Sequence, residues 1–320
     1  MLTSTLLSRY QTTFASYFVL APPDTRAKVV ACLKLLLNTI PELRSKVGLM
    51  FSYAYCRQDL HLCSTEESKQ YVEMLKEAGS QGINVILDSG AFHILARKIP
   101  LERFQRYIND YIKFCDTVAD YVQHYVIPDV PCDTRPATEV QKMPNLEKIE
   151  LTVRNAAYFL DHISDPRKAI VVVQGYHPHE YRYCAERLRE LGLVTAVTGI
   201  GSLCIRKYSK EQRQEVPKIL AEIRSVLPSW VKLHAFGLNV KFLKHREVVQ
   251  YINSSDTAAW MLPYGKFNRL RLYDPFACSM KEIDLGEATR RFRKIKLSLE
   301  TIYLYHMLSY VLLLKQLKLL

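Results

Sequence analysis

The sequence predicts an α/β protein, a single-domain (β/α)8 barrel of the TIM type with a C-terminal helical extension. Eight short apolar runs alternate with helical patterns along the 320 residues, and several of these runs end on Asp, Gln or Gly. An open sheet usually has fewer than eight strands, so the count favours a closed barrel. No repeat or linker divides the chain. We therefore expect a barrel over 1–265 and a basic, helical extension over 266–320 that packs on it.

The eight strands are expected where runs of β-branched and aromatic residues occur. The third run, at 83–87, contains no charged residue, as expected of a parallel strand that is covered on both faces. In chain order the strands are placed at 14–20, 47–55, 83–87, 121–127, 169–173, 194–198, 231–236 and from 254 onward.

Helices are expected where apolar residues recur every three or four positions. The pattern is clearest after the third strand, where Phe104, Tyr107 and Tyr111 share one face. A first helix carries Val29 and Leu33, and the others are placed at 66–79, 101–119, 149–162, 179–191, 244–251 and within 297–320.

Polar residues gather at the predicted strand ends. Asp88, Asp129 and Gln174 follow the third, fourth and fifth strands, and Asp256 lies at the eighth. In a barrel these positions share the carboxyl rim, where catalytic sites are built. Two carboxylates at a sugar C1′ are the general apparatus of glycosyl transfer. Each residue alone is equally well explained as a helix cap or a salt-bridge partner, and Asp88 or Ser89 in particular is suited to capping.

The net charge of +12 and the pI of 9.2 favour a polyanionic partner. Nucleic acid is the first choice and an anionic membrane surface the second. The densest basic cluster comprises Arg290, Arg291, Arg293 and Lys294. It is either a track for phosphate groups or a solvated helix face.

The cysteine pattern indicates a reducing compartment. Eight cysteines occur without any Cys-x-x-Cys pair, which argues against a structural zinc site and a disulfide framework. No signal-peptide pattern is recognisable, and charged residues interrupt the apolar run at 297–320. We expect a cytoplasmic protein that does not enter membranes.

Five motifs resemble the tRNA-guanine transglycosylase superfamily in order and spacing, and most closely its DNA-modifying branch, the DpdA-type 7-deazaguanine DNA transglycosylases. The resemblance covers about residues 14–265. The motifs are Asp88-Ser-Gly-Ala-Phe92, Val173-Gln-Gly175, Gly199-Ile-Gly-Ser202, His234-Ala-Phe-Gly237 and Ser255-Asp-Thr-Ala-Ala-Trp260.

The resemblance implies roles for individual residues. Asp256 matches the nucleophile that attacks C1′ as guanine leaves, and Asp88 matches the second aspartate, which transfers or orients a proton. Phe92 would stack on the base. The substrate-binding residues implied in addition are Ser89, Asp129, Gln174, Gly175, Gly201 and Ser202.

The resemblance implies exchange of guanine for a 7-deazaguanine, such as 7-cyano-7-deazaguanine, without a redox or nucleotide cofactor. The tRNA enzymes hold zinc with three cysteines and a histidine, whereas this region offers only Cys278 and His306, so we expect no metal. DNA is the expected partner, with a helper ATPase or helicase to open the duplex. The alternatives are the same exchange on tRNA, a non-catalytic nucleic-acid-binding barrel in a modification complex, and a glycoside hydrolase.

Overall fold

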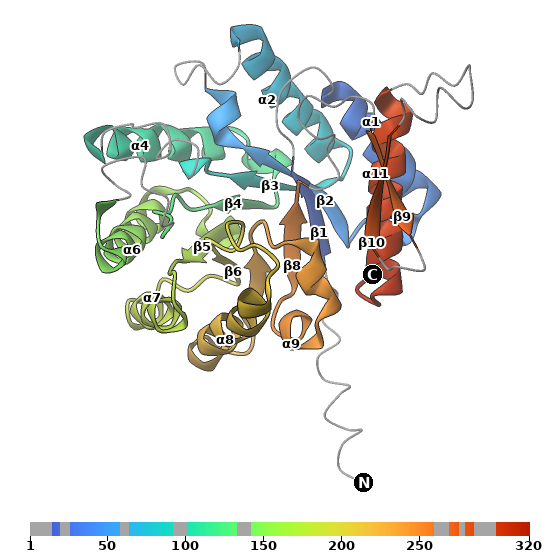
Figure 1. The fold of residues 1–320 in the computed structure, drawn as a ribbon. Coiled ribbons are helices and arrows are strands. Elements are labelled where there is room, and N and C mark those ends of the chain that lie inside the picture. The colour runs from blue at the N-terminus through green and yellow to red at the C-terminus, as the bar shows by residue number, and fades with distance from the viewer. Residues whose placement is uncertain are drawn as a thin grey trace.

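The computed structural model shows a closed barrel of eight parallel strands in the order β1 to β8, with β1 paired to β8 (Figure 1). It describes residues 15–19, 26–57, 64–91, 101–132, 142–258, 269–274, 279–284 and 299–320. The predicted fold class is confirmed. The strands are β1 (Ala15–Val19), β2 (Val47–Ser52), β3 (Asn84–Asp88), β4 (His124–Val126), β5 (Ala169–Val173), β6 (Val197–Ile200), β7 (Lys232–Ala235) and β8 (Ser254–Thr257).

Helices follow the strands and surround the barrel (Figure 1). All but α11 lie where the chain returns from one parallel strand to the next, as βα units require. They are α1 (Arg26–Thr39), α2 (Thr65–Ser80), α4 (Leu101–Thr117), α6 (Asn145–His162), α7 (Pro178–Glu190), α8 (Lys210–Val226), α9 (Arg246–Val249) and α11 (Leu299–Gln316).

Some elements differ from the sequence prediction in their presence or their bounds. Strand β2 ends at Ser52 and not at 55, and β4 begins at His124 and not at 121. Helix α8 was not predicted, and it contains Pro217, which removes one backbone hydrogen bond from the helix interior. Strand β6 begins at Val197, three residues later than expected. The delay arises because Gly192, with a φ of 68°, ends α7 in a turn in which the Leu193 amide donates to the Leu188 carbonyl.

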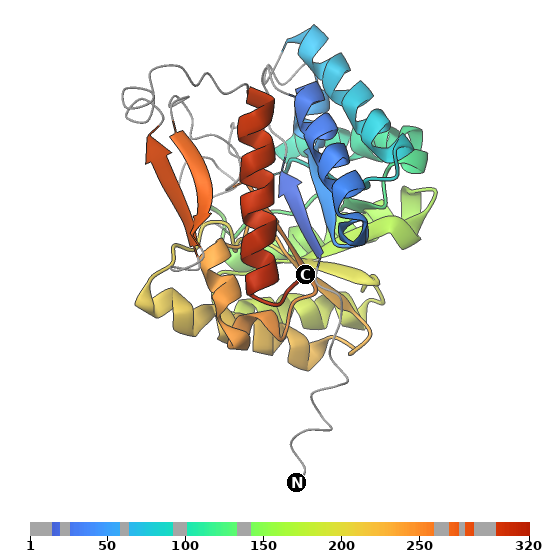
Figure 2. The same cartoon turned by 90° about the vertical axis from the view of Figure 1, so that its right-hand side faces the viewer.

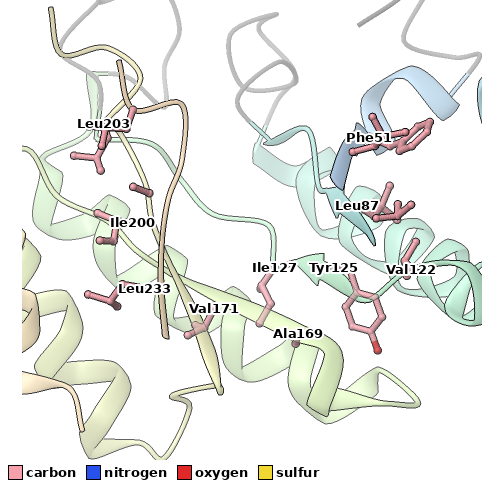
Figure 3. Packing of buried hydrophobic residues seen from close by; sticks show 14 of the residues in the cluster. Phe51, Leu87, Val122, Tyr125, Ile127, Ala169, Val171, Ile200, Leu203 and Leu233 are labelled. Atoms are coloured by element: carbon pink, nitrogen blue, oxygen red, sulfur yellow. The ribbon is translucent and has the colours of Figure 1, made fainter. Parts of the chain in front are cut away.

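The strands separate two apolar layers. Residues that point outward pack beneath the helices, and Figure 3 shows Leu87, Val171 and Leu233 among them. The inner layer fills the barrel itself with the side chains of Met50, Ile86, Val126, Ile170 and Val172. The barrel centre is therefore packed, and polar groups can gather only at its ends.

The C-terminal extension contains the predicted helix, α11, and also two strands that were not predicted. Residues 269–284 contain an antiparallel pair, β9 (Arg269–Asp274) and β10 (Ser279–Asp284), which flanks α11 (Figure 2). The alternating sequence Arg-Leu-Arg-Leu-Tyr-Asp of β9 has the period of a strand.

Helix α11 packs on the outside of the barrel. It packs against α1 (Figure 2). The Tyr310 hydroxyl lies 3.2 Å from the Ser16 hydroxyl of β1. The Tyr310 ring also meets Phe18 edge to face at 5.7 Å. Since Ser16 pairs with Ser255 of β8, α11 covers the line along which the barrel closes.

None of the helices in the described ranges combines the length and apolar character that a bilayer crossing demands.

Candidate functional site

Strand alternation directs Asp88 and Asp256 into the barrel at its carboxyl end. Ile86 belongs to the inner layer, and Asp88 lies two residues further along β3, so both side chains face the same way. Asp256 pairs in register with Tyr17, which packs on the inner layer from β1. The two carboxyl groups therefore share the interior surface of one barrel mouth, as the sequence predicts.

Asp256 is held through one of its two oxygens. The Gly237 amide donates to Oδ1 at 2.8 Å, and Nε2 of His234 lies 3.2 Å from the same oxygen. Asp256 is 5% exposed and His234 is fully buried. No hydrogen bond from the described residues ends on Oδ2, so this oxygen is left to act on a ligand.

Ser254 orients the His234 ring. Its hydroxyl lies 2.8 Å from Nδ1, on the opposite side of the imidazole from Asp256. A ring protonated on Nε2 can donate to the carboxylate while Nδ1 accepts from the serine. Tyr17 and Phe236 meet the same ring edge to face, at 5.8 and 4.6 Å. These contacts hold the His234 ring in one orientation, and the ring in turn orients the Asp256 carboxylate.

Asp88 is half-buried and accepts a hydrogen bond from the Gly90 amide on Oδ2 at 3.0 Å. Exclusion of water, together with the charges of Asp129 and Asp256, raises its pKa to about 7, against the lowering effect of Gly90 and Ser52. The carboxyl group is therefore about half protonated at neutral pH. A group in this state can both give and accept a proton.

Tyrosines of α4 fix the end of β3 from outside. The Tyr107 hydroxyl donates to the Ser89 carbonyl, and the Tyr111 hydroxyl donates to the Leu87 carbonyl at 3.0 Å. Ser89 is fully buried, and its hydroxyl accepts from the Ala91 amide at 3.3 Å. Its side chain thus caps the chain locally, and the expected contact of Ser89 with the base stays a prediction.

Asp129, Gln174 and Ser202 form a polar triad beside Asp88. The Gln174 amide nitrogen donates to Oδ2 of Asp129, and the Ser202 hydroxyl donates to Oε1 of Gln174 at 2.8 Å. Burial raises the pKa of Asp129 to about 6, although the bond from Gln174 opposes the shift. The triad presents donors and acceptors in fixed positions, which suits recognition of a planar polar ring.

Glycine at position 201 makes room for the triad. A Cβ atom there would lie 2.0 Å from Nε2 of Gln174. The Gly201 amide donates to the Val173 carbonyl at 3.0 Å, and its carbonyl accepts from Tyr181 at 2.8 Å. Both backbone groups thus have a partner within the fold, and the expected contact of Gly201 with the base stays a prediction. A Cβ on Gly175 would approach the Tyr181 amide to 2.7 Å, so Gly175 serves close packing of α7.

The structure brings five of the predicted site residues into one mouth: Asp88, Asp129, Gln174, Ser202 and Asp256. Other predicted site residues lie outside the described part of the chain, namely Phe92, Arg290, Arg291, Arg293 and Lys294.

His234 and Tyr17 were not predicted as site residues. Each lies on the same face of its strand as Asp256. Strand alternation combined with the pairing of β7, β8 and β1 would have identified both, but that pairing is known only from the fold.

No group of three or more His, Cys, Asp or Glu side chains within the described residues is arranged to hold a metal ion. Cys278 falls outside those residues. The expected absence of a metal therefore stays a prediction.

Neither the models of known protein families nor the curated proteins that were searched match this chain. The function has to be argued from the site and its chemistry.

Proposed function

We propose that this protein is a base-exchange transglycosylase that replaces guanine in DNA with a 7-deazaguanine, such as 7-cyano-7-deazaguanine. The motif resemblance supplies the reaction class. The observation that carries the proposal is a pair of unlike acids in one mouth: Asp256 offers a free Oδ2, and Asp88 has a pKa of about 7. A nucleophile and a proton carrier are the two groups that glycosyl exchange needs.

In the first step Oδ2 of Asp256 attacks C1′ of the deoxyribose. The new bond joins Oδ2 to C1′, the bond from C1′ to N9 of guanine breaks, and the electron pair leaves with the base. Protonated Asp88 gives its proton to the departing purine. The hydrogen bonds on Oδ1 keep the carboxylate oriented while Oδ2 reacts.

The second step reverses the first with another base. N9 of the 7-deazaguanine attacks C1′, the ester to Asp256 breaks, and Asp88 takes the N9 proton. Each bond that breaks is replaced by one of the same kind, so no oxidant or energy source is consumed. Asp88 returns to its protonated form and Asp256 to its carboxylate.

The polar triad supplies contacts for the base. Asp129 and the Gln174 amide can bind the N–H and C=O groups of a guanine-like edge while Ser202 keeps the amide oriented. Bases within a duplex cannot reach such a mouth, so the target is a flipped or single-stranded nucleotide. This need explains the proposed helper ATPase or helicase.

The test is an exchange assay on single-stranded DNA with 7-cyano-7-deazaguanine, followed by mass spectrometry of the released nucleosides. We expect the wild-type protein to incorporate the deazapurine and Asp256→Asn to abolish incorporation. Asp161→Asn is the matched control, because Asp161 is 83% exposed on α6.

Three outcomes would overturn the proposal. Incorporation into tRNA and not into DNA would show that tRNA is the substrate. No incorporation into either, with DNA binding intact, would indicate a non-catalytic barrel. Equal activity of Asp256→Asn and wild type would show that Asp256 is not the nucleophile.

A further inference from the structure

Six basic side chains lie on the two connections that follow β6 and β7, each taken here to include the first residues of the next helix, α8 or α9. We call these connections the two loops and the six side chains the rim cluster. All six are exposed. The stretches 207–213 and 241–247 hold only two acidic residues against them, Glu211 and Glu247, which leaves a net charge of +4. The members are Lys207, Lys210, Arg213, Lys241, Lys244 and Arg246.

Some basic residues elsewhere on the surface are paired with acids. Arg182 pairs with Glu186 and Glu222, at 2.9 and 3.2 Å, and Arg187 pairs in the same way with two glutamates. In the rim cluster the lysines at 207, 210 and 241 form no ion pair with any residue that the structure describes. Their positive charge is therefore open to an external anion.

Two acidic residues beside the cluster have partners outside it. Glu215 lies 2.8 Å from the buried Arg206 guanidinium, and Glu247 lies 3.4 Å from His245. The Glu215 carboxylate is thus directed at the buried Arg206, and the Glu247 carboxylate at His245.

Tyr208 joins the two loops into one surface. Its hydroxyl lies 2.6 Å from Nε2 of His245, and its ring meets Phe242 edge to face at 5.2 Å. The Arg213 guanidinium and the Lys241 ammonium both lie against that ring, at 5.6 and 5.8 Å from its centroid. Charges from two separate loops are therefore held close together, in spite of their mutual repulsion.

The cluster borders the Asp256 side of the mouth. Lys207 follows Ser202 of the polar triad by five residues, and Lys241 follows Gly237, the amide donor to Asp256, by four. The loops also touch, since a Cβ on Gly237 would lie 2.5 Å from Cβ of Cys204.

We propose that the rim cluster binds the phosphodiester backbone of single-stranded DNA and so delivers the target nucleotide to the mouth. This inference rests on the proposed function, because it places the strand whose base is exchanged. Lysine ammonium groups bind phosphates as point charges without reading sequence. A membrane surface fits less well, because none of the exposed large apolar side chains in the described residues belongs to these loops.

The test compares two triple variants that lose the same charge. Lys207→Ala, Arg213→Ala and Lys241→Ala together remove half of the cluster. Lys34→Ala, Lys113→Ala and Lys218→Ala together form the control, since these lysines are exposed on α1, α4 and the middle of α8. Binding of a fluorescent oligonucleotide of about 16 nucleotides is measured by anisotropy over a range of salt concentrations.

We expect the rim variant to bind at least tenfold more weakly at 0.1 M salt, with a salt slope reduced by about 2, since each lost contact to single-stranded DNA removes about 0.7. The control is expected to retain the slope and affinity of the wild type. Thermal unfolding of both variants verifies that they fold.

Equal weakening of both variants, or an unchanged slope in the rim variant, would overturn the inference. So would tighter binding of the wild type to phosphatidylserine vesicles or to single-stranded RNA than to DNA. The exchange assay keeps the two proposals separate. If the wild type exchanges bases and the rim variant binds DNA normally, the rim cluster is not the DNA-binding surface, and the proposed function stands. If the rim variant loses DNA binding but the wild type exchanges no base, the proposed function fails, and the rim cluster stands as a DNA-binding surface.

Discussion

His234 is a buried side chain with a hydrogen-bond partner on each ring nitrogen. Asp256 lies on one side and Ser254 on the other. A buried polar group in this position restricts its neighbours because any movement would leave it unsatisfied. We interpret His234 as a positioning residue that aims Oδ2 of Asp256.

Replacement of His234 by Gln, which keeps a donor, should lower kcat by about tenfold, and replacement by Ala by about 100-fold. KM for the base should change little, because the ring does not contact it. The two variants are compared by steady-state exchange kinetics over a pH series. A loss that appears in KM, or an equal loss in both variants, would assign His234 a purely structural role.

Asp88 illustrates how a polar residue responds to its surroundings. Its pKa rises from 3.8 to about 7 because water is excluded and two acidic groups are near. The folded protein therefore binds a proton on Asp88 between pH 4 and pH 7, where the unfolded chain has released it. This residue stabilises the fold fully below about pH 4, and the contribution is lost as the pH rises through 7.

Asp88→Asn removes this pH dependence. At pH 8 the variant should be more stable than the wild type by about 2 kcal/mol, roughly half the value that three pKa units imply, because Asp88 is partly exposed. At pH 4 the two proteins should be alike. Urea unfolding at both pH values measures the difference, and greater stabilisation at pH 4 than at pH 8 would contradict the predicted direction. Exchange by the variant should fall at every pH.

At the residue scale the sequence predicted the acids but not the local roles. Asp88 stands out because it ends an apolar run, whereas Asp256 lies in the polar strand Ser254–Thr257 and was found through its motif. The capping role of Ser89 and the engaged backbone of Gly201 depend on Ala91, Val173 and Tyr181, whose positions only the folded chain defines.

Strand β6 and the residues that follow it approach their neighbours closely. Gly201→Ala should displace the Gln174 amide, because the new methyl group would lie 2.0 Å from its nitrogen. We expect a loss of about 1–3 kcal/mol in stability and at least a tenfold loss of exchange.

Gly192→Ala is the control for Gly201→Ala. Gly192 has a φ of 68°, and no atom lies within 4 Å of the place that an alanine Cβ would take, so alanine costs about 1 kcal/mol through the backbone alone. It should leave exchange unchanged. If both variants lose stability and activity in the same proportion, the close approach to Gln174 is not the cause.

Helix α11 secures the pairing of β1 with β8. Tyr310→Ala should cost about 3–5 kcal/mol because it removes a buried ring and its contacts with Ser16 and Phe18. Tyr305 lies on the same helix and is 45% exposed, so Tyr305→Ala should change stability by less than about 0.5 kcal/mol. Chemical denaturation of both variants tests this, and similar losses would contradict the assignment.

Elements with a regular pattern were predicted well, and irregular ones were not. The span of β5, at 169–173, agrees with the prediction because every residue is apolar and a turn precedes it. Helix α8 was missed because Pro217 interrupts its pattern, and the β9–β10 pair was missed because charged residues alternate with apolar ones over only six positions.

For the whole molecule the alternation of eight apolar runs with helical patterns was sufficient to predict the barrel. Right-handed βα units leave few other arrangements for such a chain. The same regularity predicted that the acids share one rim. It did not predict their hydrogen-bond partners, because side-chain contacts across the mouth depend on strand stagger, which the sequence pattern does not specify.

Each of six successive strands, from β3 to β8, contributes at least one group to the mouth at its carboxyl end or just beyond it. A chain with even one of these strands detached has no complete binding surface, so a purine that fits the mouth is bound by the native state alone. At a concentration one hundred times its Kd, such a compound adds about 2.7 kcal/mol to the free energy of unfolding. Heat-denaturation scans with a panel of purines and deazapurines would therefore identify the occupant without any catalytic assay.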